Sequence, residues 1–234
     1  MMQKKSVLFL LGIVTVTATI WWWMKYHSTN SLFYNNEPIY LQNVNFEYQK
    51  GFFTLYKTSH ADVVMFGDSH IFGINWNEAL AREGVINRGI RGDITEGFLK
   101  RLDEVYTLHP KVCFVMGGIN DLYANIPVHT ILKNYYKMVE ELRRNNIVVV
   151  IQATIYVGAG RESYIEKNKE VTILNNELRR YAQRENIRFI DINPFVCENS
   201  MLLSKFTVDG LHLTANGYAL WLPEIEKALV SNGL

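Results

Sequence analysis

The sequence predicts an α/β fold: a three-layer α/β/α sandwich around a five-stranded parallel sheet. Five short runs of apolar and β-branched residues alternate with segments that carry apolar residues at helical spacing. This alternation is typical of βαβ units, and runs that are apolar throughout indicate strands covered on both faces. The length of 234 residues suits one such domain with a terminal extension.

The five predicted strands share Val, Ile, Phe and Met residues, and most of them end at a glycine or a polar loop. The clearest of them is the fourth, which reads Ile-Val-Val-Val-Ile. In chain order the strands are Asp62–Phe66, Val85–Asn87, Val112–Met116, Ile147–Ile151 and Ile187–Ile192.

Four segments between and after these strands have the apolar spacing of amphipathic helices. The first stops at His109-Pro110, and the second opens at Pro127. The apolar positions are, helix by helix, Phe98, Leu99, Leu102, Val105 and Leu108; Ile131, Tyr135, Met138 and Leu142; Leu174, Leu178 and Tyr181; and Tyr218, Trp221, Leu222 and Ile225.

The N-terminus has the pattern of a transmembrane anchor. The run Ser6–Met24 has no charged residue, and it approaches the roughly 20 residues needed to cross hydrocarbon. Lys4-Lys5 favour a cytoplasmic N-terminus, and Trp21–Trp23 suit an aromatic belt at the far interface. A signal peptide cleaved near Val16-Thr17-Ala18 is the alternative, although its apolar region would be only about 7–15 residues long. The length and interface arguments favour the uncleaved anchor, and both interpretations place the rest of the chain outside the cytoplasm.

We therefore expect three regions. An anchor or signal peptide covers residues 1–24, a linker and packing segment covers residues 25–60, and the α/β domain covers residues 61–234. The middle region is polar with scattered aromatic residues. Because the aromatic side chains around Tyr40–Tyr56 need cover, we expect that stretch to pack on the domain.

Composition excludes several classes of protein. With 48% hydrophobic residues the chain is not intrinsically disordered, and a net charge of +1 lacks the basic footprint of a nucleic-acid-binding protein. Cys113 and Cys197 are too few for a four-cysteine zinc site and are expected to be unpaired. Most histidines are scattered without metal-ligand spacing, so neither a metal nor a cofactor is predicted.

Polar motifs follow four of the predicted strands, at the edge where open doubly wound sheets collect their chemistry. Each motif alone is compatible with an ordinary turn or helix cap. Their joint occurrence in this order indicates one functional site. They are Gly67-Asp68-Ser69-His70, Asn87-Arg88-Gly89-Ile90, Gly118-Ile119-Asn120-Asp121 and Asp209-Gly210-Leu211-His212.

With these motifs the chain resembles the SGNH hydrolases, or GDSL esterase/lipase superfamily, from residue 61 to the C-terminal helix. The residues that name the family are matched by Ser69, Gly89, Asn120 and His212. The details look closest to platelet-activating-factor-acetylhydrolase-like and carbohydrate-acetylesterase members. The resemblance implies a flavodoxin-like sheet of order 2-1-3-4-5, with Ser69 and Asn120 on either side of the switch point.

The residue types suit acyl transfer. A serine hydroxyl needs an adjacent base to become a nucleophile, which is the role expected of His212 toward Ser69. Asp209 would orient the imidazole and stabilise the imidazolium. The expected oxyanion-hole donors are the Ser69 N–H, the Gly89 N–H and the Asn120 side-chain amide. Gly89 is included because glycine permits close approach of backbone to a ligand.

We therefore expect an exported, membrane-anchored serine esterase that removes a small acyl group, with O-acetyl on carbohydrate favoured, through an acyl-serine intermediate. A lipid or thioester acyl hydrolase of the same fold is an alternative. A non-catalytic binding domain is a third, which the complete nucleophile and base argue against. Trp76, Tyr123 and Tyr156 are candidate aromatic platforms for substrate. His70 is expected to be at most a pocket wall or a group that supports the site from behind. Gly158-Ala159-Gly160 lacks the lysine of a phosphate loop and is expected to be flexible.

Overall fold

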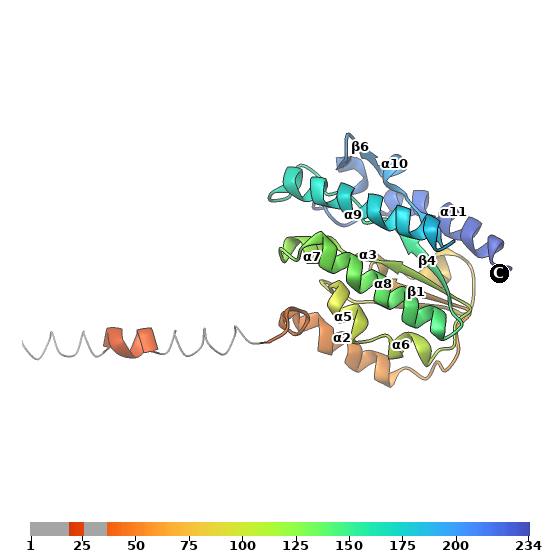
Figure 1. Cartoon of the computed structure of the whole chain (residues 1–234), viewed down its shortest axis with the longest axis horizontal. Helices are drawn as coiled ribbons and strands as arrows, with labels where there is room; N and C mark the ends of the chain where they lie inside the picture. The colour runs from red at the N-terminus through yellow and green to blue at the C-terminus, as the bar shows by residue number, and fades with distance from the viewer. Residues whose placement is uncertain (1–18, 26–36) are drawn as a thin grey trace, which may run out of the picture. The chain divides into compact units, whose positions relative to one another are not determined.

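The computed structural model describes residues 19–25 and 37–234 (Figure 1). They divide into two compact units, Met1–Gln42 and Asn43–Leu234. In the first unit residues 19–25 are helical and Ile39–Gln42 form a short 3-10 helix, η1. Most of the predicted anchor lies outside the described residues. Within residues 19–25 and 37–234, no helix is both long enough and apolar enough to span a bilayer.

The second unit is built on a five-stranded parallel sheet of order β2-β1-β3-β4-β5. The predicted number of strands and their order are confirmed. Gly67 at the end of β1 lies opposite Gly89 of β2 and Met116 of β3. The loops that follow these three strands therefore leave the sheet at the same edge. The strands are β1 Val63–Gly67, β2 Val85–Gly89, β3 Val112–Met116, β4 Val148–Gln152 and β5 Arg188–Ile190.

Helices cover both faces of this sheet. The two-stranded hairpin of β6 and β7 and the short helix η2 lie between α10 and α11 in the chain. The elements are α2 Val44–Leu55, α3 Ser69–Phe72, α4 Trp76–Ala79, α5 Thr95–Leu99, α6 Asp103–Tyr106, α7 Ile119–Tyr123, α8 Val128–Arg144, α9 Tyr164–Arg184, α10 Asn193–Val196, β6 Cys197–Glu198, β7 Met201–Leu202, η2 Ser204–Phe206 and α11 Ala215–Ser231.

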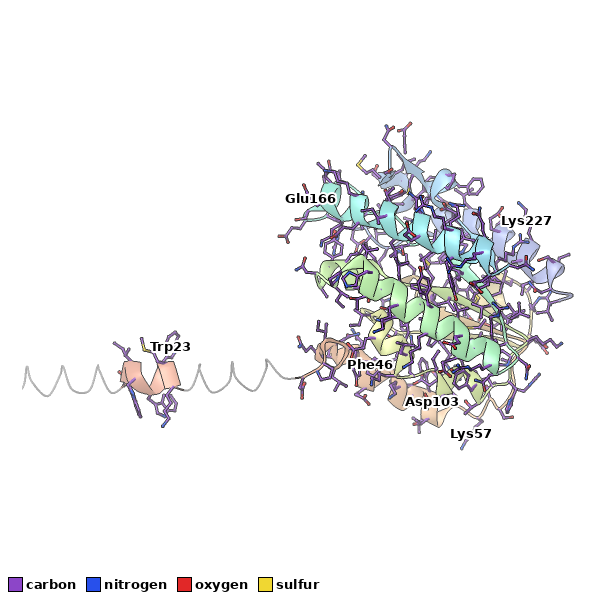
Figure 2. All side chains as sticks on the ribbon, viewed as in Figure 1. Trp23, Phe46, Lys57, Asp103, Glu166 and Lys227 are labelled. Atoms are coloured by element: carbon purple, nitrogen blue, oxygen red, sulfur yellow. The ribbon has the colours of Figure 1, made fainter. Side chains whose placement is uncertain are left out.

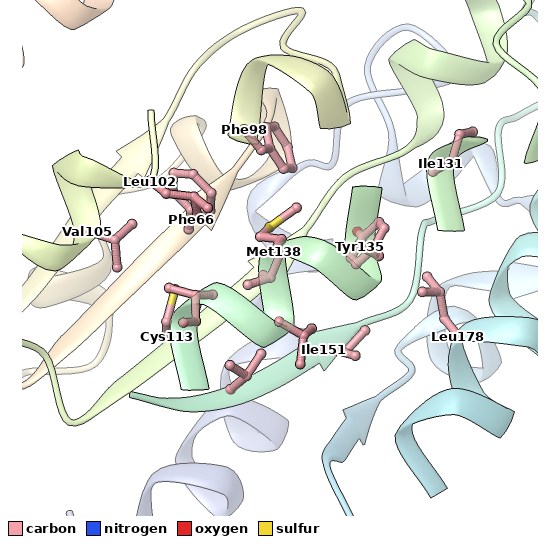
Figure 3. Close-up of a cluster of buried hydrophobic side chains, with 14 of the residues drawn as sticks. Phe66, Phe98, Leu102, Val105, Cys113, Ile131, Tyr135, Met138, Ile151 and Leu178 are labelled. Carbon is pink, nitrogen blue, oxygen red and sulfur yellow. The ribbon is translucent and has the colours of Figure 1, made fainter. Parts of the chain in front are cut away.

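Alternate residues of each strand face different cores. Phe66 and Cys113 belong to one cluster with side chains of α5, α6, α8 and α9, part of which Figure 3 shows. Met65 and Phe114 belong to a second cluster with α3, α4 and α11. Side chains of a strand point alternately to opposite faces, so a strand that is apolar at every position needs both layers of helices.

One predicted helix is wrong in its extent. Instead of a single helix over residues 98–108, the chain forms α5 and α6 with a break around Arg101. The Arg101 side chain is fully buried, and its guanidinium donates to the carbonyls of Gly67 at 2.9 Å and Arg88 at 2.8 Å. It also donates to Asp93 Oδ2 at 2.7 Å. Because the helix breaks here, the Arg101 guanidinium points inward. It links the ends of β1 and β2 to Asp93, in the loop after β2.

Replacing Arg101 with methionine is expected to destabilise the domain by about 3–5 kcal/mol, because it leaves one partner of a buried ion pair uncompensated. Burial already raises the pKa of Asp93 to about 6, although Arg101 acts to lower it. Urea denaturation at pH 7 measures the effect. The matched control is Arg188→Met, at an exposed arginine of β5, which should change the stability by less than about 0.5 kcal/mol. Equal urea midpoints for Arg101→Met and Arg188→Met would contradict the stabilising role assigned to Arg101.

Helix α2 packs on the domain, as expected for the stretch around Tyr40–Tyr56. Phe46, labelled in Figure 2, and Phe53 are buried. Asn43 caps the helix by accepting from the Asn45 N–H, and its own amide donates to the Arg91 carbonyl at 2.8 Å. The compact unit therefore starts at Asn43 rather than at residue 61, and its first residue contacts the loop after β2.

Candidate active site

Ser69 is the first residue of α3, two residues beyond the end of β1. Asp68 caps this helix, since its Oδ1 accepts from the His70 N–H at 2.9 Å. Asp68 therefore orders the loop that carries Ser69. The first N–H groups of a helix have no intrahelical acceptor, and the Ser69 N–H has none among the described residues.

Residues far apart in the chain meet at Ser69. His212 Nε2 lies 3.0 Å from Ser69 Oγ, and His212 Nδ1 lies 2.7 Å from Asp209 Oδ2. An ionised carboxylate only accepts, so the ring hydrogen sits on Nδ1 and Nε2 accepts from the serine hydroxyl. The predicted nucleophile, base and carboxylate are therefore brought together in one hydrogen-bonded series.

The turn over residues 209–212 explains their close spacing. Asp209 Oδ1 accepts from the backbone N–H of Leu211 at 2.9 Å and of His212 at 2.8 Å, while Oδ2 holds the ring. Gly210 has a φ of +80°, a conformation that favours glycine. Burial alone would raise the pKa of Asp209, but the hydrogen bonds from His212 and Leu211 lower it to about 2. The carboxylate is therefore ionised at every working pH.

Asn120 approaches the site from the next strand. It is the second residue of α7, which follows β3 and starts after Gly118 with a φ of +113°. One hydrogen of the Asn120 amide is donated to the Asp93 carbonyl at 2.9 Å. The second amide hydrogen has no acceptor among the described residues. Ser69 and Asn120 thus follow β1 and β3, on either side of the topological switch point, as expected.

Gly89 does not supply the oxyanion-hole N–H that was expected of it. Its N–H donates to Asn87 Oδ1 at 2.8 Å and is not available to a ligand. A Cβ at this position would clash with the backbone nitrogen of Phe72. The absence of a side chain at Gly89 therefore serves the close packing of β2 against α3.

Gly92, which was not among the expected oxyanion donors, fits that role better than Gly89. It has a φ of +72°, and within the described part of the chain its N–H has no acceptor. The next residue, Asp93, supplies the carbonyl that accepts from Asn120, so the Gly92 peptide and the Asn120 amide lie together. A second glycine three residues after Gly89 was visible in the sequence. The spacing of the two glycines did not predict which of their N–H groups would stay free.

Of the two roles expected for His70, the structure favours a group that supports the site from behind. It is buried, with Nε2 3.0 Å from the Leu211 carbonyl and Nδ1 3.3 Å from Asp68 Oδ1. Both neighbours only accept when Asp68 is ionised, so a doubly protonated ring satisfies both. Burial acts to lower the pKa of His70, but Asp68 and the Leu211 carbonyl outweigh it and raise that pKa above its usual value. His70 therefore joins the loop of Ser69 to the turn of His212.

The three aromatic candidates fall in different places. Trp76 is buried and packs edge-on against Trp221 at 5.2 Å, so it is not a substrate platform. Tyr156 is half-buried, and its hydroxyl lies 3.0 Å from Thr172 Oγ1. Tyr123, at the end of α7, is half-buried one turn beyond Asn120. Of the three, Tyr123 is on the helix that carries a site residue.

Neither cysteine forms a disulfide: Cys113 is buried in β3, and Cys197 is half-buried in β6. No cluster of three or more His, Cys, Asp or Glu side chains among residues 19–25 and 37–234 could hold a metal ion.

Comparisons with known proteins agree with this geometry. The model of the GDSL-like lipase/acylhydrolase family matches residues 65–220. Human platelet-activating factor acetylhydrolase IB subunit alpha1 is 30% identical over 172 residues, which cover 69% of this chain and 72% of that protein. The solved structure of a GDSL-like lipase from Bacteroides thetaiotaomicron shares the fold, with a TM-score of 0.70 and 23% identity over 80% of this chain and 98% of that one.

A longer relative matches over a part of its length. The N-acylneuraminate cytidylyltransferase of Streptococcus agalactiae is 25% identical over 186 residues. The match covers 76% of this chain but 43% of that protein, so the chain spans less than half of this curated relative.

Proposed function

The chain belongs to the GDSL-like lipase/acylhydrolase family, and on that premise we propose that it is a serine esterase that hydrolyses an ester of a small acyl group. The observation that carries the proposal is the hydrogen-bonded series from Ser69 Oγ through His212 to Asp209. A binding domain has no need of a nucleophile, a base and a carboxylate aligned in this way.

The proposed reaction uses these groups in turn. His212 Nε2 takes the hydroxyl proton as Ser69 Oγ attacks the ester carbonyl carbon, and Asp209 stabilises the imidazolium that forms. The imidazolium then protonates the leaving alcohol oxygen, and an acyl-serine remains. Water, deprotonated by the same imidazole, attacks the acyl carbon and releases the acid together with the Ser69 hydroxyl.

Three donors are placed to stabilise the oxyanion. They are the Ser69 N–H at the start of α3, the Gly92 N–H and the free amide hydrogen of Asn120. The loop that contains Gly92 is held by the buried pair of Arg101 and Asp93, and by Asn43 on the Arg91 carbonyl. Fixed donors of this kind stabilise developing charge without having to reorganise.

An acetyl group is the proposed acyl part, and a carbohydrate the proposed alcohol. The human relative is named an acetylhydrolase, which supports a small acyl group. The loops around the site are built from short helices and turns at the open edge of the sheet. Such an open site suits an ester group on a large, exposed alcohol.

One observation favours the alternative of a longer acyl chain. A cavity of about 680 Å³ lies beside Asp209 and Gly210 and is walled in part by apolar side chains, among them Met201, Leu202 and Val208. A hydrocarbon chain lying in it would gain about 0.8 kcal/mol for each buried methylene.

A series of p-nitrophenyl esters separates the two acyl groups. For an acetylesterase we expect kcat/KM to stay level or fall from acetyl through butyryl to octanoyl, because the added methylenes find no cover. A rise of about fourfold for each methylene would instead show that the chain is being buried, and would establish the longer-chain alternative. A panel of acetylated sugars assayed alongside tests the proposed alcohol.

We also propose that the protein is anchored by residues 1–24 with its catalytic domain on the extracytoplasmic side. The uncharged run Ser6–Met24 and the tryptophans at its end support this. N-terminal sequencing of the protein from the membrane fraction tests it. An intact N-terminus is expected, and a mature protein that starts near Thr19 would show cleavage instead.

A further inference from the structure

One side of the site is formed by the loop between β4 and α9. The Gly158 N–H donates to the Gly210 carbonyl at 2.7 Å, and the Arg161 N–H donates to the Gly158 carbonyl at 3.1 Å. Tyr123 Oη donates to the Glu162 carbonyl at 3.1 Å. Gly158, in the Gly-Ala-Gly segment that was expected to be flexible, is therefore held against the turn that carries the base. Glu162, further along the same loop, is held against the helix α7 that carries Asn120.

The side chain of Arg161 runs between these two elements. Its stem packs over Gly210, where a Cβ would lie 2.9 Å from Arg161 Cγ and 3.3 Å from Cδ. Its guanidinium carbon lies 5.5 Å from the centre of the Tyr123 ring. A cation over an aromatic face is attracted by the negative potential of the ring. The stem and the head of Arg161 are thus each held by a neighbour that flanks the site.

Arg161 takes part in no ion pair among residues 19–25 and 37–234, and its Nε is buried without an acceptor. The nearby Asp209 carboxylate is committed, since both of its oxygens accept from the His212 turn. Lys167, which also faces the Tyr123 ring, differs in donating to Glu170 and to the Leu122 carbonyl.

The proposed mechanism indicates which half of the ester would lie near Arg161. His212 protonates the leaving oxygen, so the alcohol half lies on the side of the His212 turn. Gly210, against which the Arg161 stem packs, belongs to that same turn. The acyl carbonyl lies instead among the Ser69, Gly92 and Asn120 donors.

We propose that Arg161 binds an oxyanion, a carboxylate or a phosphate, carried by the alcohol half of the substrate. A guanidinium presents a planar fork that pairs with either oxyanion through two hydrogen bonds. The proposal rests on the proposed esterase function and deepens it: the substrate is an anionic ester, and Arg161 determines that preference.

Two matched pairs of acetyl esters test this on the full chain. One pair is the acetylated methyl glucuronoside and the acetylated methyl glucoside, and the other is acetyl-glycerol phosphate and acetyl-glycerol. In at least one pair the wild type is expected to prefer the anionic ester by about tenfold to a hundredfold in kcat/KM, the range for hydrogen bonds to a charged group. The pair that shows the preference tells a carboxylate from a phosphate.

Variants assign that preference to one side chain. Arg161→Gln should bring the ratio of the anionic to the neutral ester close to one, and Arg161→Lys should retain part of it because the charge remains but the fork does not. Added salt should reduce the wild-type ratio. Arg188→Gln, at the opposite end of the sheet, is the control and should keep the ratio.

The outcomes separate the two proposals. If wild type hydrolyses the anionic and neutral members of both pairs equally well, or if Arg161→Gln keeps the wild-type ratio, the assignment of Arg161 is wrong and the esterase stands. If no ester is hydrolysed and a fluorophosphonate fails to label the folded chain, the esterase function itself is wrong.

Discussion

Replacing Ser69 with alanine is expected to lower kcat for ester hydrolysis by about 10⁶-fold, the scale seen when the nucleophile of a serine hydrolase is removed. The variant keeps the oxyanion donors and the base, but it has no oxygen to form the acyl intermediate. Hydrolysis of p-nitrophenyl acetate measures the loss, and labelling of Ser69 by a fluorophosphonate should disappear in parallel.

Ser59→Ala is the control for this prediction. Ser59 is exposed and precedes the amino end of β1, at the opposite end of the strand from Ser69. The activity and the labelling of the Ser59→Ala variant should therefore stay within about twofold of the wild type. If the Ser69 variant were folded and kept more than a small fraction of the wild-type kcat, Ser69 would not be the nucleophile.

Replacing Asp209 with asparagine is expected to lower kcat by about 10⁴-fold, because the imidazole loses the acceptor that fixes its tautomer and the charge that stabilises the imidazolium. The hydrogen bonds that Asp209 accepts lower its pKa to about 2, against an ordinary value of 3.8. Because this pKa lies far below neutrality, protonation of Asp209 should cause no loss of wild-type kcat above about pH 5. Hydrolysis of p-nitrophenyl acetate by the wild type and the variant at pH 7 measures the effect of the substitution.

Asp103→Asn is the matched control. Asp103, labelled in Figure 2, is exposed in the first turn of α6, so the kcat of this variant should stay near the wild-type value. An Asp209→Asn variant that retained kcat within tenfold of wild type would mean that another group orients His212.

The sheet could be predicted from local patterns because each strand is apolar on both faces. Val112–Met116 has no polar residue and is buried at every position, which only a strand between two helix layers requires. The apolar face of α8, with Ile131, Tyr135 and Met138 at helical spacing, is fully buried as expected. In both cases the burial follows from the periodicity of the element itself.

The break between α5 and α6 could not be predicted in this way. Phe98, Leu102 and Val105 have the spacing of one continuous helix, and all three are buried. What divides them is Arg101, whose guanidinium reaches the carbonyls of Gly67 and Arg88. These two carbonyl groups come within reach of Arg101 only once β1 and β2 have paired. The local sequence pattern therefore cannot predict the break.

The sequence by itself determined which motifs lie at the catalytic edge, because the carboxyl ends of parallel strands share one edge and the motifs follow those strands. It therefore predicted that Ser69, Asn120 and the Asp209–His212 turn would meet. The tertiary structure alone decided which donors stay free and which charges stay unpaired: the Gly89 N–H is taken by Asn87, whereas the Gly92 N–H and the head of Arg161 have no acceptor in the described structure. The physical reason is that a hydrogen bond depends on competition among groups brought close by folding, and periodicity carries no information about that competition.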